Sequence, residues 1–365
     1  MQRSLRTFHL WLGLVAGIFI SIMGISGLLI VFRSDIEGMS APPVAKQNLG
    51  ARPARGTWLE IERQLSSMNP DAHISRVVFP PSAGGLLLIQ TATKDKRRVE
   101  FFADAESGKI LCVKQPVAWL NWVVDLHQNL LIGKTGRAAT GIIGAALLLL
   151  SLSGLASWLT GRRDWKRALA LPRGGPWQRV NFELHRWPGL WLNLLLIVVS
   201  FTGIVLAYPG FFSVEQRSSM SSRKTRAERG ERLQLLSLAD YVRAAEGAVA
   251  GGVIRELRLS GGVSAMLWAP GDLRPKGASL VVLDVASAKI LSVQRPGPSL
   301  VEYANAIHKV ELGGLPVKLL WSLSGLLPAF LAVSGGQIWW TRRQAARRTA
   351  RRIQLAARVP SPVME

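Results

Sequence analysis

The sequence predicts a membrane protein built from a bundle of four transmembrane helices, with two small α+β domains on the outer side of the membrane. Three observations predict this fold class: four long uncharged apolar runs, basic clusters on one side of these runs, and an internal repeat that relates the two halves of the 365-residue chain. Because an even number of spans separates equivalent helices, the tandem halves should be related by a pseudo-twofold axis along the membrane normal.

Each of the four apolar runs is long enough to cross a bilayer. They cover residues 10–32, 138–161, 187–214 and 319–341, and none contains a charged residue. A helix of this length spans about 35 Å, whereas the hydrocarbon core is about 30 Å thick. One such run could be a buried core helix, but four runs indicate a membrane. The first run is longer than the apolar part of a signal peptide and lacks a small-residue cleavage site, so we expect it to be an uncleaved helix.

The basic residues predict the orientation. Arg and Lys crowd the start of the chain, the segment between the second and third runs, and the segment after the fourth run. Basic loops stay in the cytoplasm, so both termini should be cytoplasmic and the two long loops periplasmic, in a bacterial inner membrane. The net charge of +22 then reflects topology and contact with the lipid bilayer, and no nucleic-acid partner is expected. The single cysteine, Cys112, excludes an internal disulfide, a CxxC pair and a cysteine-ligated iron–sulfur cluster within this chain.

The repeat is visible as matching motifs in the two halves. His-Leu-Trp-Leu-Gly at 9–13 matches His-Arg-Trp-Pro-Gly at 185–189, and residues 105–111 match 285–291. A Ser-Gly pair with a Trp four residues later recurs at 153–158 and 334–339, and one histidine precedes each of spans two and four. Each half is therefore expected to run helix, outer domain, helix.

Each outer segment reads as one amphipathic helix followed by four short strands. The first helix should end near residue 69, with strands at 74–79, 85–92, 97–104 and 109–114. The second helix is expected at 237–249, with strands at 254–260, 263–269, 278–285 and 289–294. The predicted organisation is span one at 1–34, outer domain one at 35–118, an interfacial segment with span two at 119–163, a cytoplasmic loop at 164–184, span three at 185–212, a linker with outer domain two at 213–300, an interfacial segment with span four at 301–342, and a basic cytoplasmic tail at 343–365.

Four of the five histidines occupy repeat-related positions near the membrane faces. His9 and His185 begin spans one and three, and His127 and His308 precede spans two and four. Imidazole binds iron, copper and zinc, but two histidines underfill a zinc site and no carboxylate or thiol recurs beside them. Haem iron needs only two axial ligands. The pattern therefore predicts one haem iron between His9 and His185 near the cytoplasm and a second between His127 and His308 near the outer face.

Small residues follow the inner histidines on the same helix faces, at Gly13, Gly17 and Gly189. Glycines at this spacing favour close helix packing when taken alone, and a flat slot for a porphyrin when taken with the paired histidines. Arg137 and Arg186 are candidate partners of haem propionates, or else ordinary snorkelling anchors.

The outer pair requires a bend in the chain. His127 and His308 each lie 11 residues before an uncharged run, so a continuous helix would lift them roughly 16 Å above its boundary. Gly133, Gly136 and Gly314 make a bend into the interface the expected solution.

The order of these motifs over nearly the whole chain resembles the PepSY-associated transmembrane family. The resemblance rests on the H-x-W-x-G openings, the histidine before span two and the S-G-x-x-x-W endings, and this chain departs from the family at Leu10, where Arg is frequent, and at Pro188. It implies two PepSY-like periplasmic domains. It also implies two b-type haems and electron transfer to a periplasmic ferric chelate or siderophore, as in the family's iron-regulated proteins and ferric-siderophore reductases.

Two other functions stay open from the sequence. One is a haem-free protein whose outer domains bind or regulate a periplasmic peptide, protease or metal complex. The other is a permease-type helper, which uncharged spans disfavour. No Ser/His/Asp set or HExxH motif supports a hydrolase. The cytoplasmic segments are too short for a flavin or nicotinamide domain, so we expect a separate electron donor: a reductase, a soluble reductant or a quinol.

Overall fold

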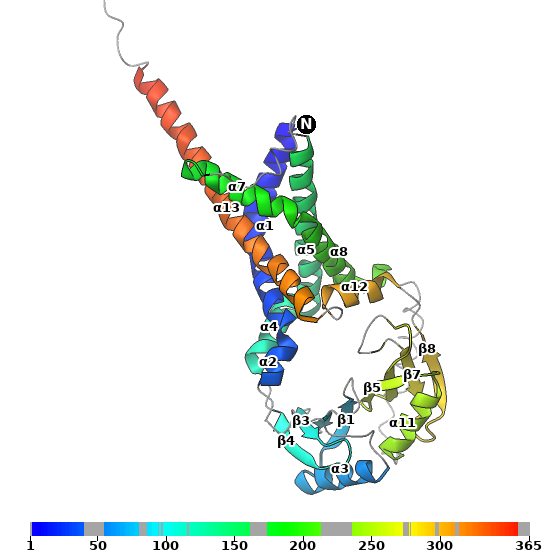
Figure 1. Ribbon diagram of the computed structural model, residues 1–365. Coiled ribbons are helices and arrows are strands. Elements are labelled where there is room, and N and C mark those ends of the chain that lie inside the picture. Colours follow the sequence, from blue (N-terminus) through cyan, green and yellow to red (C-terminus); the bar gives the residue numbers. More distant parts are fainter. Residues whose placement is uncertain are drawn as a thin grey trace, which may run out of the picture. The chain divides into compact units, whose positions relative to one another are not determined.

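Two compact units make up the protein, and each is described separately (Figure 1). The computed structural model describes residues 2–39, 55–79, 86–93, 95, 98–114, 117–160, 174–212, 236–272, 277, 279–295, 299–310 and 314–356. The helical unit comprises residues 1–31, 120–208 and 315–365, and the sheet unit comprises residues 32–119 and 209–314.

The helical unit contains long apolar helices at all four predicted spans. Three are single helices, α1 (Gln2–Val31), α5 (Gly133–Leu159) and α13 (Gly314–Ala356), each long and apolar enough to cross a membrane. The predicted third span is instead a bent pair, α7 (Trp177–Trp191) and α8 (Asn193–Ala207), with an angle of 61° between them. The apolar run at 187–214 did not reveal this break.

The bend in span three lies at Leu192, after Pro188. Pro188 lies inside α7 and has no backbone N–H to donate to the preceding turn. Leu192 then leaves helical geometry, with φ −96° and ψ 7°. Its N–H donates to the Pro188 carbonyl at 3.0 Å, and its own carbonyl begins α8 by accepting from the Leu196 N–H at 3.1 Å. The chain therefore turns at Leu192 without leaving a gap in these hydrogen bonds.

Short helices precede spans two and four, as the sequence predicted from the glycines. Helix α4 (Ala118–Asn129) ends before Leu130 and Leu131, which have φ of 50° and 64°. Helix α12 (Leu300–His308), in the sheet unit, is followed by Val310 with φ of 54°. Left-handed backbone cannot continue an α-helix, so each short helix is separated from the span that follows it.

The sheet unit is built on one eight-stranded antiparallel sheet with the strand order β4-β3-β2-β1-β5-β6-β7-β8. The strands lie close to the predicted ranges: β1 (His73–Val78), β2 (Leu87–Ala92), β3 (Arg98–Ala103), β4 (Ile110–Lys114), β5 (Val253–Arg258), β6 (Val263–Trp268), β7 (Ser279–Leu283) and β8 (Ile290–Gln294). The repeat in the sequence predicts two separate outer domains. The structure instead joins the two four-stranded halves through β1 and β5.

The join between β1 and β5 follows the repeat. Val77 lies directly opposite Leu257, and the flanking pairs are Arg76 with Arg258 and Val78 with Glu256. Val77 and Leu257 are equivalent positions of the repeat, so a local twofold axis of the sheet passes between them. Each half alone would expose an unpaired strand edge here, and the pairing removes both edges.

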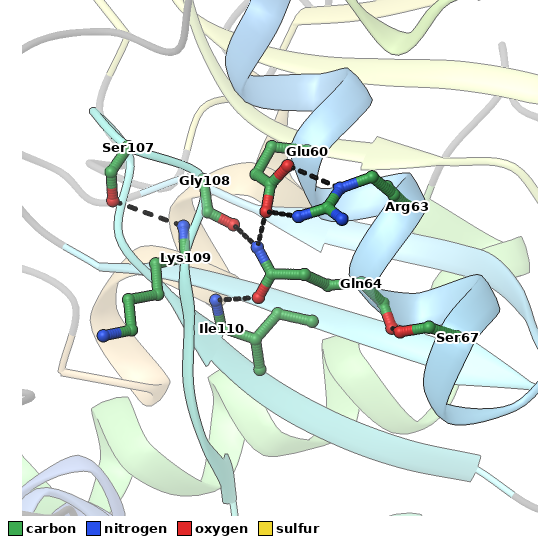
Figure 2. A network of polar contacts seen from close by, with 8 residues as sticks. All are labelled: Glu60, Arg63, Gln64, Ser67, Ser107, Gly108, Lys109 and Ile110. Atoms are coloured by element: carbon green, nitrogen blue, oxygen red, sulfur yellow. Dashed lines mark hydrogen bonds and ion pairs between the residues drawn. The ribbon is translucent and has the colours of Figure 1, made fainter.

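Two helices, α3 (Arg55–Met68) and α11 (Leu238–Gly247), cover the core of this sheet. Trp58 and Ile61 from α3, and Tyr241 from α11, are at most 1% exposed and join one hydrophobic cluster with the strands. Figure 2 shows how α3 is attached to the turn between β3 and β4. Gln64 donates to the Gly108 carbonyl at 3.3 Å and accepts from the Ile110 N–H at 3.0 Å.

Candidate metal-binding histidines

Two histidines from different spans face each other in the helical unit. The rings of His9 on α1 and His185 on α7 have centroids 6.4 Å apart and an interplanar angle of 88°. Two imidazoles that bind one metal ion from opposite sides, through bonds of about 2 Å, have centroids roughly 6 Å apart. The structure therefore brings this predicted pair to a separation that suits one shared metal ion.

The Nδ1 atom of each inner histidine is held by a serine on a neighbouring helix. His9 Nδ1 lies 2.9 Å from Ser153 Oγ, and His185 Nδ1 lies 2.9 Å from Ser334 Oγ. The two serine hydroxyls donate to carbonyls in their own helices, at 3.1 and 2.8 Å. Each Oγ therefore accepts from an Nδ1–H. This tautomer leaves the Nε2 lone pair for a metal, in the arrangement that proteins use to orient metal-binding histidines.

A glycine follows each of these serines and makes room for the ring. A Cβ atom at Gly154 would lie 3.2 Å from Cε1 of His9, and one at Gly335 would lie 3.2 Å from Cε1 of His185. Each imidazole thus packs directly on helix backbone while the adjacent serine fixes its rotation. We call each such pair a Ser-Gly cradle. Both Ser-Gly pairs are visible in the sequence as repeat matches, but the sequence does not link them to the histidines.

His127 has a third cradle near the other end of α1. Its Nδ1 lies 3.0 Å from the Met23 carbonyl and 3.0 Å from Ser26 Oγ, and a Cβ at Gly27 would lie 3.0 Å from its Cε1. A carbonyl can only accept, so Nδ1 carries the proton and Nε2 keeps its lone pair. Burial lowers the pKa of His127, against the opposing effect of the Met23 hydrogen bond. The ring is therefore neutral near pH 7, as metal binding requires.

Ser26, which contacts His127, lies 17 positions after His9 on α1. The positions on α1 that mark the two histidine sites are therefore about 25 Å apart along the helix. That is close to the thickness of a hydrocarbon core. His308 is the last residue of α12 in the sheet unit. Its pairing with His127 stays a prediction.

The other predicted site residues lie on helix contacts or at the surface. A Cβ atom at Gly17 would lie 3.2 Å from the Cβ of Ala332. A Cβ atom at Gly13 or at Gly189 would lie 3.6 or 3.5 Å, respectively, from a leucine side chain. Arg186 pairs with Glu183 through Nε at 2.8 Å, and Arg137 is exposed. The assignment of these five residues to a haem slot and its propionates stays a prediction.

Two buried indole groups near the inner histidines bear on whether a cofactor fits. Trp158 lies one turn after Gly154, and Trp187 lies two residues after His185. The Nε1 atoms of both are buried and have no hydrogen-bond partner within the described parts of the chain. A buried donor without an acceptor is costly, so both suit a non-protein acceptor such as a carboxylate. Among the described residues, no group of three or more His, Cys, Asp or Glu could hold a metal ion. The two facing imidazoles of His9 and His185 could bind a metal ion that already carries equatorial ligands.

Comparisons with known proteins give a family match. The family described as "PepSY-associated TM region" matches residues 6–342. The chain is also similar to "Uncharacterized protein PA4219" of Pseudomonas aeruginosa, with 32% identity over 84 residues that cover 23% of this chain and 21% of that protein. The chain thus spans about a fifth of the length of this relative.

Proposed function

Since this chain belongs to the PepSY-associated TM region family, we propose that it is a dihaem electron-transfer protein of the bacterial inner membrane that reduces a ferric chelate or siderophore on the periplasmic side. The observation that carries the proposal is the facing pair of His9 and His185, with ring centroids 6.4 Å apart. Iron in a porphyrin has four equatorial ligands already, so two imidazoles complete it.

The protein's own residues would bind, orient and shield the inner haem. His9 and His185 would hold the haem iron through Nε2, while Ser153 and Ser334 keep the proton of each ring on Nδ1. The indole N–H groups of Trp158 and Trp187 are available to carboxylates of the cofactor. A haem held in this way supplies one-electron redox chemistry.

The proposal of an outer haem rests on His127 and on the sequence repeat. His127 has a similar Nδ1 restraint and glycine contact to the inner histidines, and the sequence repeat predicts His308 as its partner. The positions of His9 and Ser26, which contacts His127, lie about 25 Å apart along α1, so groups held by the two histidines would connect a cytoplasmic donor with the outer face. There one electron would convert Fe(III) to Fe(II), which oxygen-rich chelators bind less tightly.

An absorption spectrum of the full-length protein, purified in detergent from haem-replete cells, tests the proposal. We expect a Soret band that shifts on reduction with dithionite. His185→Ala should remove about half of the bound haem, because one of two sites loses an axial ligand. The matched control is His73→Ala, which alters an exposed histidine at the start of β1 and should retain both haems.

Three outcomes would contradict this assignment. A colourless wild-type preparation would favour a haem-free binding protein. Equal haem loss in both variants would show that the loss does not depend on the histidine pair. Full haem retention in His185→Ala would place the iron elsewhere.

A further inference from the structure

A basic groove lies in the helical unit beside the end of α13 that extends beyond its apolar run. It has a volume of about 510 Å³. Helix α7 contributes Gln178 and Phe182, and the facing side of α13 contributes Arg342, Arg348 and Arg352. Threonine, glutamine, alanine and isoleucine side chains of α13 complete the lining.

The groove carries charge of one sign. Three of its described lining residues are arginines and none is a carboxylate. The guanidinium carbon of Arg342 lies 5.8 Å from the centroid of the Phe182 ring, so this arginine is already oriented across the groove. A guanidinium binds phosphate oxygens through paired hydrogen bonds, and three of them in one groove favour a phosphate-containing ligand.

The position of the groove along α13 corresponds to the lipid headgroups. The uncharged run ends at Thr341 and Arg342 begins the basic segment, so the boundary between apolar and charged sequence lies at the groove. Trp339 and Trp340 immediately precede it, and Arg343 lies over the Trp339 ring at 5.3 Å. Tryptophans with adjacent arginines are typical of the membrane–water interface. The apolar side of the groove, at Phe182 and Ile338, suits the part of an acyl chain that adjoins the lipid headgroup.

We propose that this groove binds the headgroup of an anionic phospholipid, with Arg342, Arg348 and Arg352, which follow one another along α13, as the residues that attract its negative charge. Basic pockets between transmembrane helices bind such headgroups. A soluble phosphate compound would match the arginines but would not use the apolar wall that faces the membrane. The proposal does not depend on the bound haems.

The same helix offers a matched control. Arg343, Arg347 and Arg351 repeat at intervals of four residues, so they share one stripe of α13, and none of them lines the groove. Neutralising either set removes three positive charges from the same segment. Only the first set removes them from the groove.

The test is native mass spectrometry of the full-length protein in detergent, titrated with cardiolipin, phosphatidylglycerol or phosphatidylcholine. The wild type should retain the two anionic lipids in preference to phosphatidylcholine. The triple variant Arg342→Gln/Arg348→Gln/Arg352→Gln should bind the anionic lipids at least about tenfold more weakly. The control triple variant Arg343→Gln/Arg347→Gln/Arg351→Gln should bind within about twofold of the wild type.

Several outcomes would overturn the proposal. Equal weakening in both triple variants would indicate unspecific attraction between charges. Unchanged lipid binding in the groove variant would exclude the groove. Displacement of bound lipid by millimolar pyrophosphate would indicate a soluble anion as the ligand. If the groove triple variant fails to give the wild-type circular dichroism spectrum, the single change Arg342→Gln must still weaken anionic lipid binding more than Arg343→Gln does.

Discussion

The helical unit and the sheet unit differ in where they place many of their large apolar residues. In the sheet unit, Trp58, Leu87 and Leu257 are almost fully buried. In the helical unit, Ile18 is 69% exposed and Leu194 is 72% exposed, while several small polar side chains are buried: Ser26, Ser151, Ser153, Ser200, Thr202, Ser322, Ser324 and Ser334.

The difference shows which solvent surrounds each unit. Water drives leucine and tryptophan into a core, whereas lipid is as apolar as leucine and provides no such driving force. Helices in lipid associate instead through close backbone contact and hydrogen bonds. A Cβ atom at Gly325 of α13 would lie 2.7 Å from the Gly24 carbonyl of α1, so these two helices touch through their backbones. Apart from Ser151, these buried serines and threonine donate to carbonyls in their own helices, as Ser26 does to Ile22 at 2.7 Å.

The largest effect should come from truncating a leucine in the sheet unit. Leu257 is 0% exposed at the join of the two halves, so Leu257→Ala should cost about 2–5 kcal/mol of stability through lost burial and a cavity. Leu194→Ala makes the same chemical change on the outside of the helical unit and should cost less than about 0.5 kcal/mol. Thermal unfolding of the full-length protein in detergent, followed with limited proteolysis of each unit, measures both. Similar losses in the two variants would show that the units do not differ in the way proposed.

An intermediate effect should come from enlarging a glycine in the helical unit. At Gly335 an added side chain meets the His185 ring, whereas nothing lies within 4 Å of a Cβ at Gly336. Gly335→Val should therefore destabilise the unit by about 1–3 kcal/mol through overpacking, and Gly336→Val should not. Both changes carry the same helix-propensity cost, so the difference in unfolding temperature isolates the contact. Equal shifts would mean that the Ser-Gly cradle does not hold the ring tightly.

The sequence predicted what depends on local pattern and left open what depends on distant contacts. Apolar run length predicted the long helices, and turn residues predicted the strands and the breaks before spans two and four. The bend at Leu192 escaped prediction because the apolar run continues through it. Pro188 was recorded as a departure from the family, but one proline does not reveal where the chain turns.

The cradles and the joined sheet escaped prediction for a different reason. Ser153 and Ser334 are separated from their histidines by 144 and 149 residues, and the pairing of β1 with β5 links equivalent strands of the two repeats. Neither follows from local propensity. The repeat held a usable signal, since Ser-Gly pairs recur in both halves at nearly the same offset as the histidines.

The smallest effect concerns charge at the join of β1 and β5, where Arg76 and Glu256 form an ion pair between the two halves of the sheet unit. Burial alone would raise the pKa of Glu256, but hydrogen bonds with Arg76 and Arg258 hold it below its ordinary value of 4.5. A carboxyl with a lowered pKa in the folded state stabilises it above pH 4.5, and this contribution is lost as the pH falls through the folded pKa. Because Arg76 is partly exposed, the contribution should be less than about 1 kcal/mol.

Glu256→Gln should therefore lower the unfolding temperature at pH 7 and converge with the wild type once the pH has fallen below the lowered pKa of Glu256 in the folded state. Glu62 on α3 is the matched contrast, because burial raises the pKa of Glu62 and its charged form is disfavoured in the folded state. Glu62→Gln should raise the unfolding temperature at pH 7, with a gain that shrinks as the pH falls. Unfolding curves of the three proteins between pH 3 and 7 test both signs. If the Glu256→Gln curve ran parallel to that of the wild type, the Arg76–Glu256 pair would contribute nothing to the join, and the buried contact between Val77 and Leu257 would hold the two halves together by itself.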